Sequence, residues 1–223
     1  MKITWLGHAS FRIEIEKAVL LIDPWLEGNP SFPTERRAEA IAGATHIVLT
    51  HGHFDHTNEV DAVAKDTGAL VVGIPELCAV FSAHETIEFN KGGTVDLNGA
   101  HVSMVQATHS SSTKAGYAGT EAGYMIKGDG HMIYVSGDTD IMADMDWMGD
   151  FYNPDIGILC AGGHYTMGME GAAYAAKRYF NFKTVIPCHF GTFPLLAQSA
   201  QPLVDALPEI DVKTPAVMES MTF

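Results

Sequence analysis

Residues 50–56 of this chain read Thr-His-Gly-His-Phe-Asp-His and directly follow the apolar run Ile47–Leu49. The segment holds three imidazoles and one carboxylate, the side chains that commonly bind zinc and similar divalent ions. A turn after a buried strand can direct alternate side chains toward two different ions. The alternative is a solvated polar turn, or histidines that cap the next helix, but the density of the cluster favours a metal site.

Three more candidate ligands stand alone in the sequence. His109 and Asp138 each lie just past an expected strand of a hairpin, and His189 follows the expected strand Val185–Cys188. Loops at the ends of strands gather along one edge of a β-sandwich and often bear functional residues. We therefore expect these three side chains to meet the 50–56 cluster at one edge.

The remaining elements indicate two packed sheets with helices outside. Residues 3–22 alternate apolar and polar side chains in the manner of strands. Asn98-Gly99 and Asp129-Gly130 each favour a tight hairpin, so the middle of the chain is predicted to be antiparallel β. A last strand is expected at Ala216–Met218. No linker or repeat interrupts the chain, which predicts a single α/β domain over residues 1–223.

Composition argues against several classes of partner. The formal net charge of −14 at pH 7 disfavours nucleic acid, because it offers no basic face to release counterions. No apolar run approaches the roughly 20 residues that cross a bilayer, so no membrane partner is expected, and the mature protein is expected to start at Met1. The three cysteines form no C-x-x-C pair, which favours a reducing, cytoplasmic setting. A small-molecule substrate is the expected partner.

These motifs, taken in order, resemble those of the metallo-β-lactamase superfamily. The resemblance rests on T-H-x-H-x-D-H at 50–56, then a lone His109, then G-D-T at 137–139, then a C-terminal His189. The segments 5–10 and 162–168 are similar to its compact metal-dependent hydrolase branch, which is related to the ascorbate-6-phosphate lactonases. The resemblance implies a four-layer αββα sandwich. It also suggests a homo-oligomer, because several relatives of this branch form one.

The resemblance further implies seven ligands for two divalent metal ions. It places one ion on His51, His53 and His109, and the second on Asp55, His56 and His189, with Asp138 between them. Asp23 would hydrogen-bond a ligating histidine, although an ordinary turn aspartate before Pro24 is an equal alternative. His8 is expected to lie close behind the ligands. Zinc is the first expectation for the ions, with Mn or Fe as alternatives, because N and O ligands accept all three.

The expected chemistry is hydrolysis by a hydroxide that bridges the two ions. Cations bridged by Asp138 would lower the pKa of a shared water toward about 7. Asp55 could orient the hydroxide or accept a proton. His164 and Tyr165 could donate to the oxyanion or leaving group, with His164 the favoured of the two. Alternatively, His164 could cap the next helix and Tyr165 could simply pack. Residues 110–123 could form a lid over the site or a plain flexible loop.

The substrate and two rival functions stay open at this point. Classical β-lactamases of this fold usually have Cys where this chain has Asp138, which favours a small ester, lactone or phosphoester over an antibiotic. The same ligands can hold iron in a redox enzyme such as a persulfide dioxygenase. A non-catalytic metal-binding protein is the third alternative, disfavoured because His and Asp ligands would leave open positions on each ion.

Overall fold

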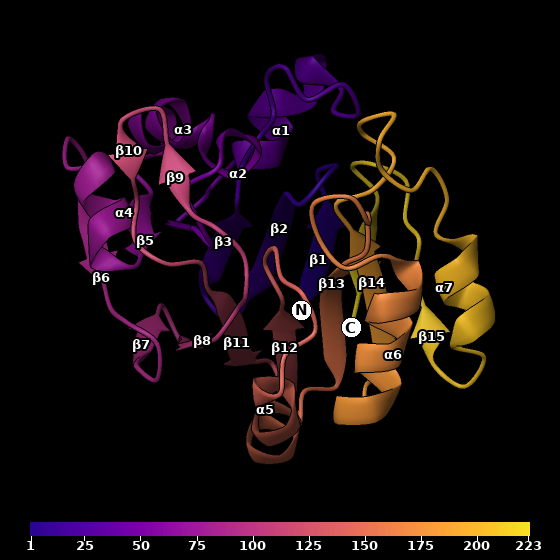
Figure 1. The fold of residues 1–223 in the computed structure, drawn as a ribbon. Coiled ribbons are helices and arrows are strands. Elements are labelled where there is room, and N and C mark those ends of the chain that lie inside the picture. Colours follow the sequence, from indigo (N-terminus) through magenta and orange to yellow (C-terminus); the bar gives the residue numbers. More distant parts are fainter.

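The computed structural model describes residues 1–223, and its framework is a pair of seven-stranded sheets (Figure 1). The first sheet has the strand order β16-β1-β2-β3-β4-β5-β6. Its strands are β1 (Lys2–Trp5), β2 (Phe11–Ile15), β3 (Ala18–Ile22), β4 (His46–Val48), β5 (Leu70–Gly73), β6 (Thr86–Glu88) and β16 (Ser220–Thr222). The second sheet has the order β15-β14-β13-β12-β11-β8-β7. Its strands are β7 (Thr94–Leu97), β8 (Ala100–Val105), β11 (Gly123–Gly128), β12 (His131–Val135), β13 (Ile156–Cys160), β14 (Thr184–Cys188) and β15 (Asp211–Val212).

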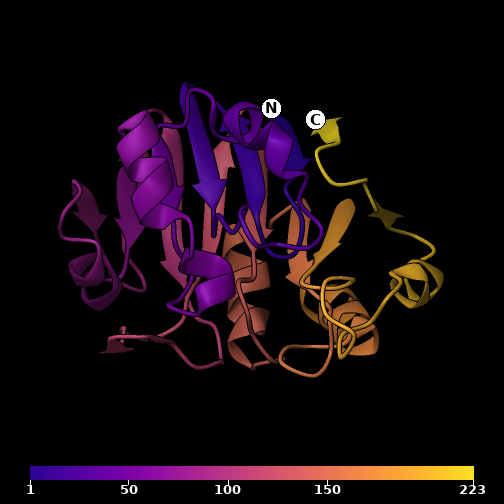
Figure 2. The ribbon, with the colours of Figure 1, turned by 90° about the horizontal axis from the view of Figure 1, so that it is seen from above.

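Helices cover the outer faces of the paired sheets, so the layer order is helix, sheet, sheet, helix (Figure 2). The helices are η1 (Thr34–Arg36), α1 (Arg37–Ile41), α2 (Phe54–Thr57), α3 (Val60–Thr67), α4 (Pro75–Val80), α5 (Asp144–Tyr152), α6 (Met169–Tyr179) and α7 (Gln201–Ala206). α3 and α4 contact the first sheet, whereas α6 contacts β13 of the second sheet. None of these helices is long and apolar enough to cross a lipid bilayer. The expected αββα sandwich is confirmed.

The pattern of buried side chains along each strand shows which of its faces are covered by the rest of the protein. In β2, Phe11, Ile13 and Ile15 are buried, whereas Arg12 and Glu14 between them are partly exposed on the opposite face. β13 and β14 are buried along their whole length, because parallel strands in the middle of a sheet are covered on both faces.

Both predicted hairpins are present in the second sheet. Asn98 and Gly99 join β7 to β8 with φ angles of 55° and 96°. Asp129 and Gly130 join β11 to β12 with φ angles of 49° and 81°. Each pair therefore adopts the two left-handed conformations that a tight antiparallel turn needs.

The prediction of a last strand at Ala216–Met218 is wrong. The strand forms later, as β16, and pairs antiparallel with β1. Met218 has a φ of 67°, and its backbone N–H donates to the carbonyl of Trp5 at 2.7 Å. The chain therefore turns at Met218 before it joins the sheet. An apolar run does not reveal such a turn, because strand formation depends on the partner strand as much as on propensity.

Strand direction brings the candidate ligands to one edge of the molecule. In the first sheet, β1, β3 and β4 share one direction, because β1 and β3 are both antiparallel to β2, and β4 is parallel to β3. In the second sheet, β8, β12, β13 and β14 likewise share one direction. Every candidate site residue of the sequence analysis follows the carboxyl end of one of these strands.

Candidate metal centre

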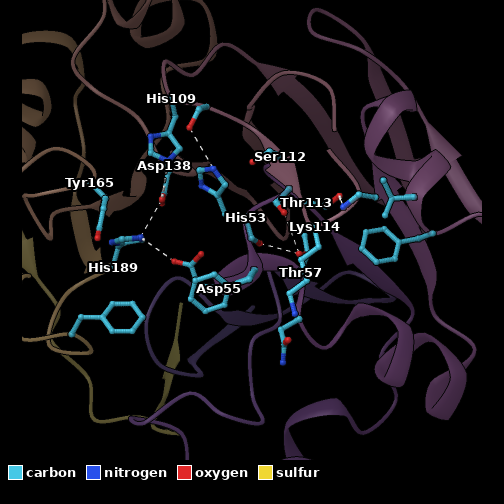
Figure 3. A pocket seen from close by; sticks show the side chains of 18 of the residues that line it. His53, Asp55, Thr57, His109, Ser112, Thr113, Lys114, Asp138, Tyr165 and His189 are labelled. Atoms are coloured by element: carbon cyan, nitrogen blue, oxygen red, sulfur yellow. Dashed lines mark hydrogen bonds and ion pairs between the residues drawn. The ribbon is translucent and has the colours of Figure 1, made fainter. Parts of the chain in front are cut away.

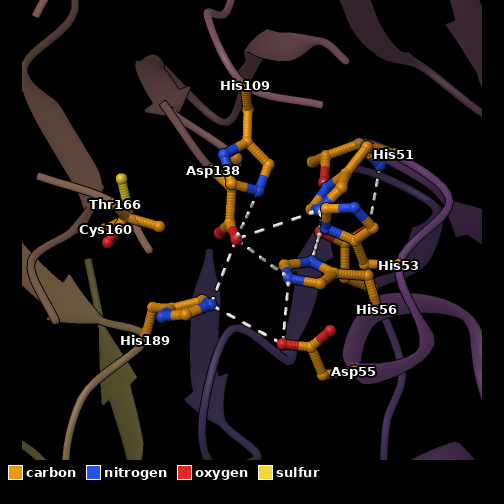
Figure 4. Close-up of polar contacts among 12 residues, drawn as sticks. His51, His53, Asp55, His56, His109, Asp138, Cys160, Thr166 and His189 are labelled. Atoms are coloured by element: carbon orange, nitrogen blue, oxygen red, sulfur yellow. Dashed lines mark hydrogen bonds and ion pairs between the residues drawn. The ribbon is translucent and has the colours of Figure 1, made fainter. Parts of the chain in front are cut away.

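The first group of candidate ligands is His51, His53 and His109, whose ligand-capable nitrogens lie within 4.8 Å of one another (Figure 4). Nε2 of His51 is 3.0 Å from Nδ1 of His53. The Thr50 hydroxyl donates to Asp23, so it accepts a hydrogen bond from Nδ1–H of His51 at 3.0 Å. Nε2 of His51 therefore presents its lone pair to the group. Burial lowers the pKa of all three histidines, and neutral imidazole is the form that binds metal ions.

The second group contains Asp55, His56 and His189, together with His8, and its ligand-capable atoms also lie within 4.8 Å of one another. Nδ1–H of His56 donates to Oδ2 of Asp23 at 2.8 Å. This hydrogen bond turns Nε2 of His56 toward the centre, where it is buried without a hydrogen-bond partner. Nε2 of His189 lies 3.6 Å from Oδ2 of Asp55. The second group is thus a mixed nitrogen and oxygen donor set.

The carboxylate of Asp138 lies between the two groups. Its Oδ2 is 3.8 Å from Nε2 of His51 and 3.6 Å from Nε2 of His109. The same oxygen is 3.4 Å from Nε2 of His56 and 3.1 Å from Nε2 of His189. Its Oδ1 is buried without a hydrogen-bond partner. One carboxylate therefore faces nitrogens of both groups.

The electrostatics of the centre fit divalent cations. Burial raises the pKa of Asp138, but His56 and His189 outweigh it and hold that pKa well below its usual range. Burial likewise lowers the pKa of His189, yet Asp138 raises it to about 9. The pKa of His56 also lies well above its usual value, because nearby carboxylates outweigh burial. Both imidazoles therefore face a concentration of negative charge, which bound divalent cations would neutralise.

Asp23 and His8, the two residues expected behind the ligands, are both buried. Oδ1 of Asp23 accepts a hydrogen bond from the backbone N–H of Thr50 at 2.8 Å, so the hydrogen bond from His56 is held by a fixed carboxylate. Nε2–H of His8 donates to Oδ2 of Asp55 at 3.0 Å, and Nδ1 lies 2.9 Å from the Thr192 hydroxyl. Burial lowers the pKa of His8 to about 4, which leaves the ring neutral.

An open pocket of about 1130 Å³ lies over the candidate ligands (Figure 3). Those that line it are His53, Asp55, His109, Asp138 and His189. One wall includes the tip of a short hairpin formed by β9 (Ser112–Thr113) and β10 (Gly116–Tyr117). The 110–123 region, expected as a lid or a flexible loop, therefore contains regular structure that borders the pocket.

The loop after β13 brings Tyr165 to the pocket, with 54% of the residue's surface exposed. His164 does not line the pocket, and its ring lies edge-on to that of Tyr165 with centroids 4.5 Å apart. The catalytic function of His164 stays a prediction. The sequence does not reveal that Tyr165 lines the pocket and His164 does not, because neighbouring loop residues point in different directions that only the backbone conformation decides.

Comparison with known proteins identifies the family of this chain. The sequence profile of the beta-lactamase superfamily domain matches residues 2–189, which include every candidate ligand. The chain is 62% identical over 229 residues to a UPF0173 metal-dependent hydrolase of Cereibacter sphaeroides, with 100% of both chains covered. It is 62% identical over 226 residues to one of Paracoccus denitrificans, with 98% of both covered.

A solved structure supports the same family assignment as the sequence relatives. Igni18, a metallo hydrolase from the archaeon Ignicoccus hospitalis, superposes with a TM-score of 0.89 at 31% identity. The superposition covers 100% of this chain and 97% of that chain. The chain therefore belongs to the beta-lactamase superfamily, in its UPF0173 group of metal-dependent hydrolases.

Proposed function

We propose that this chain is a dinuclear metal-dependent hydrolase that cleaves a small ester, lactone or phosphoester. The observation that carries the proposal is the Asp138 carboxylate, which lies between the two groups of candidate ligands. One ion would be held by His51, His53 and His109, the other by Asp55, His56 and His189, and Asp138 would serve both. Divalent ions at such a site supply Lewis acidity and acidify water, so that hydrolysis proceeds at neutral pH.

Asp55 is the residue best placed to orient the attacking water. Its carboxylate lines the pocket, and its Oδ2 accepts a hydrogen bond from the neutral ring of His8. Burial raises the pKa of Asp55, but His56 and other neighbours outweigh it and keep the carboxyl ionised at neutral pH. We therefore assign the ionised Asp55 carboxylate, as a hydrogen-bond acceptor, to orienting the attacking water.

Two further loops would position the reacting groups. The hydrogen bonds from Thr50 and His56 to Asp23 hold the first ligand loop against the end of β3. Tyr165 lines the pocket on the same side as His189, as Figure 3 shows, and its hydroxyl would donate to the leaving-group oxygen. His164 would then act by holding the Tyr165 ring through their edge-on contact.

The test is metal analysis of the purified chain, paired with a panel of lactone, phosphodiester, phosphomonoester and thioester substrates. We expect about two zinc ions per chain and turnover that a chelator abolishes. Asp138→Asn is expected to lower turnover by at least about 100-fold and to reduce the bound metal. His101→Ala is the matched control, because this histidine lies at the start of β8, opposite the end that leads to the ligands, with 59% of its side chain exposed. An Asp138→Asn protein with full metal and full turnover contradicts the proposal.

Zinc is proposed as the native metal because most of the donors are imidazole nitrogens. Iron together with oxygen consumption would instead favour a redox enzyme. Bound metal without hydrolysis of any substrate in the panel would favour a non-catalytic metal-binding protein. The open pocket above the ligands supports the enzyme, because a purely structural site needs no such access.

We also propose that residues 1–223 fold as one domain in a reducing, cytoplasmic setting. One cluster of 62 buried residues draws on both sheets. Cys78, Cys160 and Cys188 are all buried as free thiols. A stable half-chain fragment after limited proteolysis would contradict the single domain.

A further inference from the structure

Large apolar side chains that the chain exposes gather around the pocket. Eight such residues are exposed, and four of them line the pocket. These four are Phe54, Val80, Tyr165 and Leu195, with 56%, 40%, 54% and 62% of their surface exposed. Exposed apolar side chains that cluster among polar groups mark a binding surface. The pocket therefore offers an apolar region beside the candidate metal ligands.

Leu195 is exposed although its loop is fixed. The backbone N–H of Leu196 donates to the carbonyl of Phe193 at 3.0 Å. The side-chain amide of Gln198 donates to the carbonyls of Phe193 and Leu196 at 2.9 and 2.7 Å. The backbone on both sides of Leu195 is thus held in place while its side chain borders the pocket. An apolar side chain on a fixed backbone at a pocket wall is suited to binding, since the backbone loses little conformational entropy when a ligand binds.

Phe54, at another wall of the pocket, packs against other aromatic side chains. Its ring lies edge-on to the buried Trp25, with centroids 5.6 Å apart. Trp25 in turn stacks on Phe193, with centroids 5.7 Å apart and ring planes 22° from parallel. Phe54 also lies between two candidate ligands in the sequence, His53 and Asp55. Its ring is therefore held next to the position where a substrate would react.

Charge argues against a polyanionic substrate. Lys114, at the tip of the 112–117 hairpin, is the only lysine or arginine that lines the pocket. The whole chain has a formal net charge of −14. Apart from the proposed metal ions, the pocket offers this one cationic side chain, whereas recognition of a nucleotide or a phosphorylated sugar relies on several.

We infer that the substrate is a carboxylic ester or lactone with an apolar chain or ring, and that Phe54 and Leu195 bind this apolar group. The inference rests on the proposed hydrolase function of the same site. It selects carboxylic esters and lactones from the broader set that the metal ligands alone allow. Each added methylene that becomes buried would raise kcat/KM by up to about fourfold.

The first test measures kcat/KM of the metal-loaded full chain along a series of γ-lactones, from γ-butyrolactone to γ-decalactone. Bis(p-nitrophenyl) phosphate serves as the phosphodiester comparison. We expect kcat/KM to rise along the series and to exceed that for the phosphodiester. Leu195→Ser is expected to lower the ratio of long-chain to short-chain kcat/KM by about fivefold or more. Phe151→Ala is the control, because Phe151 is exposed on α5 and does not line the pocket.

The second test measures binding without turnover. Isothermal titration calorimetry of γ-octalactone with metal-free protein is expected to show binding that Leu195→Ser weakens by about fivefold and Phe151→Ala leaves unchanged. Absence of hydrolysis of every substrate by metal-loaded protein would overturn the proposed function, while the calorimetry would still test the apolar site. A flat lactone series, a preference for the phosphodiester, or equal binding by the wild type and Leu195→Ser would overturn the inference alone.

Discussion

The hydroxyl of Tyr124 joins the two sheets directly beneath the candidate ligands. Tyr124 on β11 is fully buried, and its hydroxyl donates to the carbonyl of Leu49 at 2.6 Å. Leu49 follows β4 and precedes the residues that hold the first ligand group. Tyr124→Phe removes the donor and leaves a buried carbonyl without it. We expect a loss of about 1–3 kcal/mol in the free energy of unfolding.

A matched control lies on the neighbouring strand. Tyr134 on β12 is also fully buried, but its hydroxyl has no hydrogen-bond partner. Tyr134→Phe removes an unpaired polar atom and is expected to be neutral or stabilising. Guanidinium denaturation of both variants measures the difference in unfolding free energy. Because a chain of this length loses about 2 °C in Tm per kcal/mol, calorimetry should show a drop of about 2–6 °C for Tyr124→Phe alone. Equal effects of the two substitutions would refute the reasoning.

Three further predictions concern the ligand support, the pH dependence and the packing around the site. Asp23→Ala should weaken metal binding by about 10–100-fold in a chelator competition, whereas Asp61→Ala, a surface carboxylate 74% exposed, should not. Burial lowers the pKa of His46 below its usual 6.5, so the unfolded chain binds more protons than the folded one just below that pH. The stability that neutral His46 supports is therefore present above pH 6.5 and lost as the pH falls. His46→Gln should make the denaturation midpoint depend less on pH in this range. An unchanged pH dependence would exclude His46 as its cause. Gly162→Ala would place a Cβ 1.9 Å from the carbonyl oxygen of His189, so we expect a loss of more than about 3 kcal/mol and of bound metal. Gly43→Ala, with open space and a φ of 67°, should cost only about 1 kcal/mol, and similar thermal shifts for the two variants would contradict the packing argument.

Local sequence predicted the parts of the structure that local chemistry controls. The two Asn-Gly and Asp-Gly hairpins form where they were expected, because few other residue pairs adopt two successive left-handed conformations. The 50–56 cluster predicted a metal site because a short turn after a strand keeps its side chains together whatever the rest of the chain does. The expected hydrogen bond from a candidate ligand to Asp23 is also present, between His56 and that carboxylate.

Tertiary structure decided what depends on distant segments. The hydrogen bond from His8 to Asp55 joins residues 47 positions apart, and no local pattern indicates which histidine would make it. The turn at Met218 and the later start of β16 follow from pairing with β1, at the other end of the chain. Tyr165 reaches the pocket and His164 does not, since the loop backbone sets their directions. The sequence likewise does not show that Phe54 and Leu195 are exposed at the pocket. The exposure of an apolar side chain depends on which other residues pack around it, and the whole fold decides that.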